Sequence, residues 1–361
     1  MEIVPRLVTA MLLPSQIQGP LVPGPPDRRL VIVRTDTELT VYDLDRPTTG
    51  DNAPVVSFPA PWPRDAGGVD AVAPGLDVAV FAGLHAARAV EPDGLTRWEI
   101  PHACWACGDF HESAGDYAGD ADHRYPGHGS VGFGVGARTV WAHVRGPLAG
   151  DDGSKAIGGS GAEAWLMIDV SDGTVTGRAA TATYAAGSHH IPHPDPAVMG
   201  LSVGEGQDGS PALWGRWQDG ELRIARLAGD DEVLVAAGPA GRTFLTVGHS
   251  RCHELTVHDT ADHTVVGTLF ADMLPPTDAS ACWDLHQYGL VDDRTLVAST
   301  SYYGHGETGI RHWLIDVDAL EVLGQVRYPM EVSSGPLGWG DGTWLTTGPT
   351  PNDLSVWRLP S

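Results

Sequence analysis

The feature of this sequence that most constrains its fold is a repeat of short strands. About seven similar segments follow one another, and each is rich in β-branched and aromatic residues separated by Gly, Asp and Pro. Residues 138–180, 242–270 and 294–329 show the pattern clearly. Each of these segments reads as a strand, a connection, a second alternating strand, a tight turn and a third strand, with a further strand before it. Little of the chain has a sustained helical period.

Four antiparallel strands that recur about every 50 residues predict an all-β fold, a seven-bladed β-propeller with four-stranded antiparallel blades. We expect one domain that covers residues 1–361. The last segment supplies only three strands, so we expect the N-terminal segment, residues 3–11, to add the missing outer strand and close the ring. Long rim loops are expected at about residues 102–129 and 145–162.

An aspartate stands at the predicted end of the third strand in several segments. The pairs are Tyr42-Asp43, Ile168-Asp169, His258-Asp259 and Ile315-Asp316. In this feature the chain resembles WD-repeat and related seven-bladed propellers over nearly its whole length. The Gly-His and Trp-Asp pairs of WD repeats are not present at regular spacing. The resemblance therefore implies the architecture alone, since propellers host many functions.

The formal net charge of −24 restricts the partners that this chain can have. So acidic a protein repels nucleic acid and anionic membranes, and we expect neither as a partner. No apolar run approaches the roughly 18 residues needed to span a bilayer. Because the N-terminus does not read as a signal peptide, we expect a cytoplasmic protein. Lys155 is the only lysine, which is typical of a GC-rich bacterial genome.

Most of the 16 histidines and all four cysteines fall in connections predicted to share one propeller face. Connections carry function more often than the strands that they join, so this rim is the expected site. Inner-strand positions near the rim supply four candidate metal ligands: His128, His189, His190 and His286. The alternative is that these histidines bond to backbone groups and ordered water in the channel.

The segment from His102 to Ser130 is the strongest local candidate for a metal site. It contains an H-x-C-x2-C-x3-H spacing, formed by His102, Cys104, Cys107 and His111. Thiolate and imidazole together suit zinc, or a softer metal such as copper. The alternative is that the two cysteines are free thiols, or a local disulfide, in an ordinary lid.

The other two cysteines, Cys252 and Cys282, lie on rim connections around a single blade and could be spatial neighbours. A disulfide between them is one interpretation. Thiols stay reduced in the cytosol, where we expect this protein to act, so a disulfide there is disfavoured. We therefore predict two buried and unrelated thiols.

Further polar and aromatic residues on the same rim are candidates for chemistry. Carboxylates beside imidazoles act as acids or bases, or orient metal ligands, and the candidates are Glu205, Glu307 and Asp284. The candidates for substrate contact are Trp105, Tyr302, Tyr303 and Arg251. Glycine runs at residues 204–209 and 304–309 match the dinucleotide fingerprint by letter. Neither opens a helix after a strand, so we expect no nucleotide cofactor.

These features favour a small-molecule enzyme that depends on a transition metal (Zn, Cu or Fe) and acts at a histidine-rich funnel. Lyase, isomerase and oxidoreductase chemistry all remain open. The alternative is a non-catalytic propeller scaffold that binds a peptide, a protein or another ligand. The two hypotheses predict different features at the rim. An enzyme needs converging histidines in a recessed pocket, whereas a binding module needs an exposed apolar patch.

Overall fold

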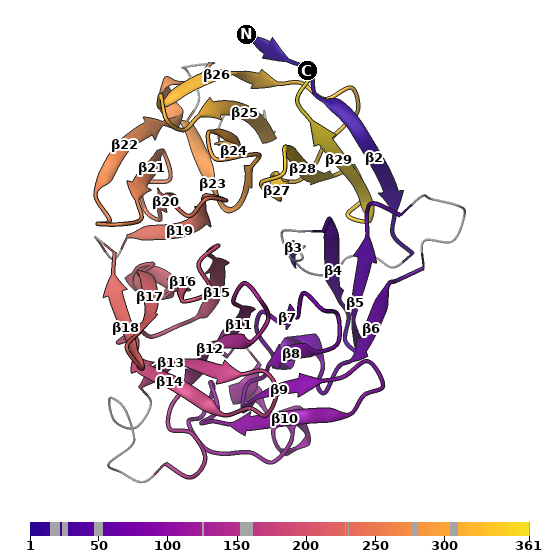
Figure 1. Ribbon diagram of the computed structural model, residues 1–361, viewed down its shortest axis with the longest axis vertical. Helices are drawn as coiled ribbons and strands as arrows, with labels where there is room; N and C mark the ends of the chain where they lie inside the picture. Colours follow the sequence, from indigo (N-terminus) through magenta and orange to yellow (C-terminus); the bar gives the residue numbers. More distant parts are fainter. Residues whose placement is uncertain are drawn as a thin grey trace. The chain divides into compact units, whose positions relative to one another are not determined.

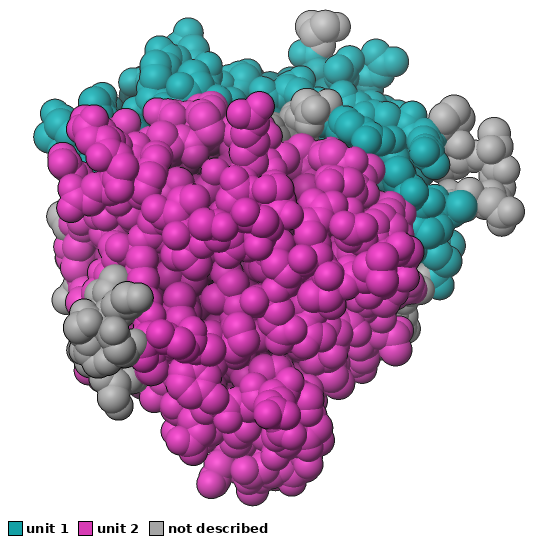
Figure 2. Space-filling view, turned by 60° about the horizontal axis from the view of Figure 1, so that its bottom comes forward, with its two compact units in different colours: residues 1–33, 41–55, 231–361 teal, residues 34–40, 56–230 magenta. Residues whose placement is uncertain are grey.

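The computed structural model describes residues 1–14, 22–23, 28–46, 53–124, 126–151, 162–227, 229, 231–275, 280–303 and 310–360. Contacts divide the chain into two compact units (Figure 2). Unit 1 contains residues 1–33, 41–55 and 231–361, and unit 2 contains residues 34–40 and 56–230. Among the described residues, the helical structure consists of short 3-10 turns, and β-strands supply the rest of the regular structure (Figure 1).

Unit 1 holds three complete sheets, with strand orders β1-β26-β25-β24-β23, β19-β20-β21-β22 and β2-β29-β28-β27. A short 3-10 turn, η5 (Ala271–Met273), follows β22. The strands are β1 (Glu2–Ile3), β2 (Arg6–Leu12), β19 (Glu232–Ala237), β20 (Thr243–Gly248), β21 (Glu254–Asp259), β22 (Val265–Phe270), β23 (Ser280–Leu290), β24 (Thr295–Tyr303), β25 (Ile310–Asp316), β26 (Glu321–Val326), β27 (Leu337–Gly338), β28 (Thr343–Thr347) and β29 (Asp353–Arg358).

Unit 2 also holds three complete sheets, β7-β8-β9-β10, β11-β12-β13-β14 and β15-β16-β17-β18. The strands are β7 (Ala71–Val72), β8 (Ala79–Ala82), β9 (Ala86–Val90), β10 (Thr96–Pro101), β11 (Ser130–Phe133), β12 (Thr139–Arg145), β13 (Glu163–Asp169), β14 (Val175–Ala180), β15 (Gly187–Pro192), β16 (Val198–Gly204), β17 (Ala212–Gln218) and β18 (Glu221–Arg226). The 3-10 turns are η1 (Arg64–Ala66), η2 (Ala114–Asp116), η3 (Ala121–His123) and η4 (Gly206–Asp208).

The remaining sheet is β3-β4-β5-β6, formed by β3 (Val22–Pro23), β4 (Leu30–Arg34), β5 (Glu38–Asp43) and β6 (Val56–Pro59). The described residues therefore form seven sheets. In five of them, neighbouring strands are successive along the chain. In the other two, the N-terminal strands β1 and β2 pair with the late strands β26 and β29. This is an all-β, seven-bladed β-propeller, which confirms the fold predicted from the sequence. The predicted loop at 145–162 falls largely outside the described residues.

The N-terminal strand β2 completes the sheet that contains the last strands of the chain, as predicted. It pairs antiparallel with β29, with Arg6 opposite Arg358 and Leu12 opposite Asp353. A second N-terminal strand, β1, was not predicted, and it pairs in parallel with β26. Gly324 permits this close approach, because a Cβ atom there would lie 2.4 Å from the carbonyl oxygen of Met1.

The second and third strands of a blade are buried on both faces, which explains their nearly continuous apolar sequences. In unit 2, Val140 and Ala142 of β12 pack with Leu166 and Ile168 of β13 in one hydrophobic cluster. The outer strand β14 is mostly half-exposed. Burying one such aliphatic side chain contributes roughly 1.5–3 kcal/mol, so these central strands hold each blade together.

The aspartates that carry the WD-repeat resemblance have a common structural role. Each ends a third strand and accepts a backbone N–H bond two or three residues later, which shapes the following turn. The pairs are Asp43 with Asp45, Asp169 with Ser171, Asp259 with Ala261 and Asp316 with Ala319, at 2.7–3.0 Å. A short carboxylate is needed here because it reaches its own turn, which explains why the pattern repeats from blade to blade.

Candidate functional site

Two cysteines of unit 2 lie in a tight turn after β10. The Cys104 N–H donates to the Asp109 carbonyl at 2.8 Å, and the Gly108 N–H donates to the Cys104 carbonyl at 2.9 Å. Gly108 has φ of +81°, a conformation that glycine adopts without strain. The Asp109 N–H lies 3.4 Å from the Cys107 Sγ atom. The Cys-x-x-Cys-Gly turn thus holds both sulfur atoms on one side of the loop, with backbone donors around them.

Two histidines from the same loop reach these sulfur atoms. The Nε2 atom of His111 lies 3.2 Å from Cys107 Sγ. His123 closes the short turn η3, whose preceding residue Asp120 accepts the Asp122 N–H at 3.1 Å. The second oxygen of Asp120 lies 3.1 Å from His123 Nδ1. Nδ1 of His123 therefore carries the proton, and its Nε2 atom is left buried without a hydrogen-bond partner among the described residues.

Tyr117 holds the two imidazoles in place. Its ring stacks on that of His123 with centroids 5.0 Å apart, and it meets the ring of His111 edge-on at 5.1 Å. The Tyr117 hydroxyl group shares a hydrogen bond of 2.9 Å with His85 Nδ1. Burial raises the pKa of Tyr117, so its hydroxyl stays protonated at neutral pH. The imidazoles are therefore fixed by packing before any ligand binds.

The resulting cluster consists of Cys104, Cys107, His111 and His123, whose ligand atoms all lie within 4.8 Å of one another. Cys104 is buried, Cys107 is exposed and the two histidines are half-buried. Two sulfur and two nitrogen donors at this spacing can hold a metal ion. Three of the four residues belong to the predicted motif, and we refer to the four as the thiol–imidazole cluster.

His102, the first residue of the predicted motif, is not in the cluster. Its backbone N–H donates to the His85 carbonyl at 2.8 Å, and its Nδ1 donates to the Ala103 carbonyl at 2.8 Å. Burial lowers the pKa of His102 to about 4, so the ring is neutral. The side chain is committed to the backbone next to it, and His123 takes the place that the spacing assigned to His102. An aspartate three residues before a histidine was the available signal for His123.

The predicted ring of histidines has different partners. His190 donates from Nδ1 to Ser130 Oγ at 3.0 Å and accepts the Trp165 indole N–H on Nε2 at 2.9 Å. His128 Nδ1 lies 3.4 Å from the Gly129 carbonyl. Within the described part of the chain, the four predicted ligands His128, His189, His190 and His286 belong to no group of three or more converging metal ligands. His128 thus bonds to a backbone carbonyl, as the alternative interpretation expected, whereas His190 bonds to two side chains.

Unit 2 also contains a buried network that the sequence analysis did not identify. Glu163 Oε2 lies 3.2 Å from His143 Nε2, a contact too poorly aligned to be a hydrogen bond, and His143 Nδ1 lies 2.9 Å from Ser188 Oγ. Ser188 Oγ also bonds to Ser130 Oγ at 2.9 Å. The Trp105 ring packs edge-on against His143, with centroids 5.4 Å apart. All five side chains are buried, so this Ser-His-Glu arrangement offers no access to a substrate.

The predicted catalytic carboxylates instead support the backbone. Glu205 Oε1 accepts the Tyr184 N–H at 2.9 Å in unit 2. In unit 1, Asp284 Oδ1 accepts the N–H groups of His286 and Gln287 at 2.7 and 3.0 Å, where the pairing of β23 with β24 is irregular. Glu307 lies outside the described residues.

The predicted substrate-binding residues divide between the two units and the residues outside the described side chains. Trp105 is buried in unit 2 against His143. Arg251 is exposed in unit 1, 3.6 Å from the carboxylate of Glu254. Tyr302 and Tyr303 end β24, and their side chains lie outside the described residues.

The prediction of two unrelated thiols at Cys252 and Cys282 was wrong. These residues form a disulfide that ties the connection between β20 and β21 to β23, with their Cα atoms 4.8 Å apart. The Trp283 N–H also donates to the Cys252 carbonyl at 2.6 Å, so the backbones are adjacent. The argument that a reducing compartment would keep these two thiols unpaired therefore led to the wrong prediction. Cys104 and Cys107 are free cysteines.

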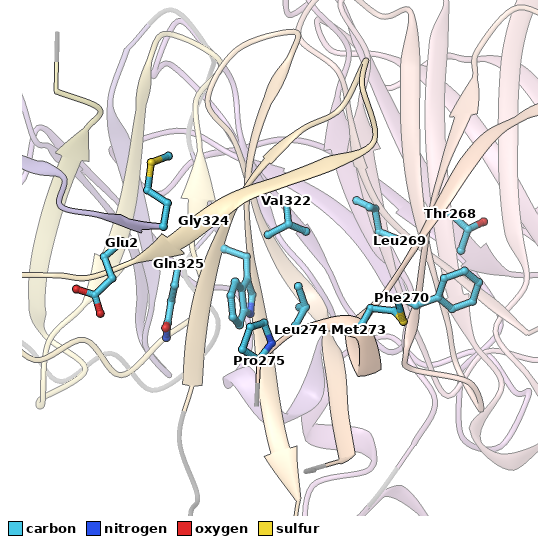
Figure 3. Close-up of a pocket in the computed structure, with 12 residues that line it drawn as sticks. Glu2, Thr268, Leu269, Phe270, Met273, Leu274, Pro275, Val322, Gly324 and Gln325 are labelled. Atoms are coloured by element: carbon cyan, nitrogen blue, oxygen red, sulfur yellow. The ribbon is translucent and has the colours of Figure 1, made fainter. Parts of the chain in front are cut away.

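Unit 1 contains a groove lined mostly by apolar residues (Figure 3). It has a volume of about 580 Å³ and lies along the ends of β22 and β26, next to β1. Trp313, Leu274 and Gly324 are the buried residues among its lining, whereas the side chains of Met1, Phe270 and Met273 are exposed. We refer to it as the β22–β26 groove.

The fold and these features define the class of this protein: a seven-bladed β-propeller with a thiol–imidazole cluster that can hold a metal ion. No protein-family model matches the chain, and no curated protein sequence is similar to it. None of the helical segments in the described residues has the length and apolar character to cross a membrane.

Many solved structures are similar in fold, and two of them illustrate the likeness. The Cps50 (Swd1) β-propeller domain of Myceliophteria thermophila has 8% identity and a TM-score of 0.41, with 82% of this chain and 97% of that chain covered. BamB from Moraxella catarrhalis has 9% identity and a TM-score of 0.49, with 98% and 100% covered. At this identity the likeness concerns the fold alone, and the propeller assignment depends on the strand pairing described above.

Proposed function

We propose that this chain is a non-catalytic binding propeller in which a zinc ion, held by the thiol–imidazole cluster, fixes the connection between β10 and β11. The observation that carries the proposal is the closed donor set. Cys104, Cys107, His111 and His123 supply four ligand atoms within 4.8 Å of one another. Structural zinc sites are four-coordinate with cysteine and histidine ligands, whereas catalytic sites keep a position open for water or substrate.

The donor chemistry favours zinc among the metals that the sequence suggested. Two thiolates and two imidazoles form the tetrahedral set that zinc prefers, whereas iron oxygenase sites use histidine and carboxylate ligands. Asp120 supports this assignment, because a carboxylate bonded to the far nitrogen of a ligating histidine is a common partner of zinc sites. Cobalt substitutes for zinc in the same geometry and makes the site visible by absorption.

The role that we infer for the metal is to order a long loop with little core of its own. Between Cys104 and His123 the chain contains only the two short turns η2 and η3, and most of its side chains are exposed. Four metal–ligand bonds supply the cross-links that such a loop lacks. The same loop places Trp105 against His143. By ordering the loop, the metal also keeps the Trp105 ring packed on the buried network.

The binding function is supported by the hydrogen bonds of two predicted catalytic residues and one predicted metal ligand. Glu205 and Asp284 are engaged with backbone N–H groups, and His190 uses both ring nitrogens in hydrogen bonds. Groups committed in this way are poorly placed to exchange protons with a substrate. A binding module needs an exposed apolar patch, and the apolar groove of unit 1 provides one.

Metal analysis of protein purified without a histidine tag tests the proposal. We expect about one zinc ion per chain, and we expect Cys107→Ser and His123→Ala to lose most of it. His102→Ala is the matched control, because His102 belongs to the same segment but not to the cluster. Protein without stoichiometric metal that takes up none on addition would contradict the proposal. Loss of zinc in His102→Ala with retention in His123→Ala would do so as well.

A further inference from the structure

The β22–β26 groove has the composition of a docking surface. Its floor contains Trp313 and Leu274, which are almost fully buried. Met273 and Phe270 also line the groove, with 76% and 43% of their surfaces exposed (Figure 3). Met1, which is 87% exposed, lines it as well. Its volume of about 580 Å³ lies within the range of known ligand sites, roughly 300–1,000 Å³. Large apolar side chains exposed together on one surface mark interaction sites.

Open strand edges border this groove. β22 is the last strand of its sheet, so its outer edge has no strand partner among the described residues. On the other side, β26 receives β1 in parallel, through the Gln325 N–H to Met1 and the Arg327 N–H to Ile3. The register of this pairing covers Gln325 and Val326 only. The edge of β26 thus already accepts one added strand, and the part that begins at Glu321 is not covered by β1.

The open edge of β26 favours an extended occupant. A Cβ atom on Gly267 would lie 2.0 Å from Leu320, so the two sheets touch at that point, and Phe270 and Met273 line the groove beyond the end of this contact in sequence. A strand that lies along β26 presents alternate side chains to one face. Its apolar residues would therefore enter the groove while its polar residues face water.

The charges near the groove favour a basic partner. Asp272 stands exposed beside Met273, and Glu321 is exposed at the start of β26. Glu2 is the one ionisable side chain among the residues that line the groove, and it pairs with Arg327 at 3.3 Å. The net charge of −24 attracts cationic segments over longer distances.

We infer that the β22–β26 groove binds an extended, apolar segment of another protein with basic flanking residues, which adds a strand to the open edge of β26 next to β1. Main-chain hydrogen bonds would supply affinity, and alternate apolar side chains on Trp313 and Leu274 would supply specificity. This inference rests on the proposed binding function and does not involve the zinc ion.

The test uses a fluorescein-labelled, lysine-flanked peptide of alternating leucine and threonine, titrated into the full chain and followed by fluorescence anisotropy. We expect saturable binding that Met273→Asp weakens at least about tenfold. Leu95→Asp in unit 2 is the matched control, since Leu95 is 63% exposed and lies in the other unit, and its affinity should equal that of the wild type. A glutamate-flanked peptide and one with a central proline should both bind more weakly.

Four results would overturn the inference. They are the absence of saturable binding by the wild type, equal affinity of Met273→Asp and the wild type, equal binding of the proline-containing peptide, and concentration-dependent dimerisation that competes with the peptide. His123→Ala separates this inference from the zinc proposal. We expect it to bind the peptide normally, so a chain that holds zinc but binds no peptide refutes only the docking site, and a metal-free chain that binds peptide refutes only the zinc site.

Discussion

Asp120 Oδ2 lies 3.1 Å from His123 Nδ1, and this contact turns the free Nε2 atom of His123 toward the two cysteine sulfurs. The aspartate thereby sets both the tautomer and the orientation of the ring. We expect Asp120→Ala to weaken zinc affinity about 10- to 100-fold, as loss of such partners does in known zinc sites. Competition with a chromophoric chelator measures the affinity.

Asp122→Ala is the control for this prediction, because Asp122 lies in the same turn and its carboxylate is exposed. Its zinc affinity should equal that of the wild type. Equal affinities of Asp120→Ala and Asp122→Ala would show that the contact between Asp120 and His123 does not tune the site.

The disulfide of unit 1 should contribute to stability independently of the metal. Replacement of both Cys252 and Cys282 by serine removes a cross-link between residues 30 apart in sequence. We expect the free energy of unfolding to fall by about 2–4 kcal/mol. Urea denaturation with and without a reductant measures this: the reductant should lower the stability of the wild type but should not change that of the double variant through this disulfide.

Thiol titration of the denatured wild type provides a second readout. It should find two free thiols per chain, those of Cys104 and Cys107. Four free thiols, or zinc lost together with the disulfide, would contradict the assignment.

The buried network around His143 makes Glu163 sensitive to substitution. Glu163 accepts the Ala185 N–H at 2.6 Å and faces Thr183 and His143. Glu163→Ala leaves the buried Ala185 N–H without this acceptor, whereas Thr183 and His143 keep Thr181 and Ser188 as partners. We expect a loss of about 1–3 kcal/mol of unfolding free energy. Glu163→Gln keeps the shape and should cost less. If both variants unfold at the urea concentration of the wild type, the network has no structural role.

Asp70 should give the stability of this protein a characteristic pH dependence. Burial raises the pKa of Asp70 from 3.8 to about 6, although the Arg34 guanidinium at 2.8 Å and the Ala82 N–H oppose the shift. The folded chain therefore binds this proton more tightly than the unfolded chain does. The stability that it contributes is complete below pH 3.8 and is lost as the pH rises through about 6.

Urea unfolding of the wild type and Asp70→Asn between pH 4 and pH 7 checks this sign, because the other titrating groups are shared. Relative to the variant, the wild type should lose on the order of 3 kcal/mol as the pH rises. Parallel profiles, or a wild type that gains stability relative to the variant, would show that Arg34 compensates for the burial.

The fold could be predicted because its signal repeats. Alternating strands, aspartates such as Asp169 and Asp316 that close the same turn, and a three-stranded last segment together define the blades and the role of β2. Strand β1 escaped prediction because its pairing covers two register positions and carries no period of its own. The β22–β26 groove is formed by three segments distant in sequence, so no local pattern could indicate it.

The site was only partly predictable because spacing does not give side-chain direction. Cys104 and Cys107 share a turn whose shape follows from Gly108, so their motif was informative. His102 has an equally suitable spacing, but its ring bonds to the adjacent carbonyl. His123 is brought to the sulfurs by the turn η3, and it lies too far along the chain from Cys107 to belong to a short sequence motif.

X-ray absorption at the zinc edge of the purified chain tests the central claim most directly. The account predicts about two sulfur neighbours near 2.3 Å and about two nitrogen neighbours near 2.0–2.1 Å, with histidine ring scattering that falls in His123→Ala and persists in His102→Ala. A spectrum with oxygen and nitrogen neighbours alone, or one that changes in His102→Ala and not in His123→Ala, would contradict it.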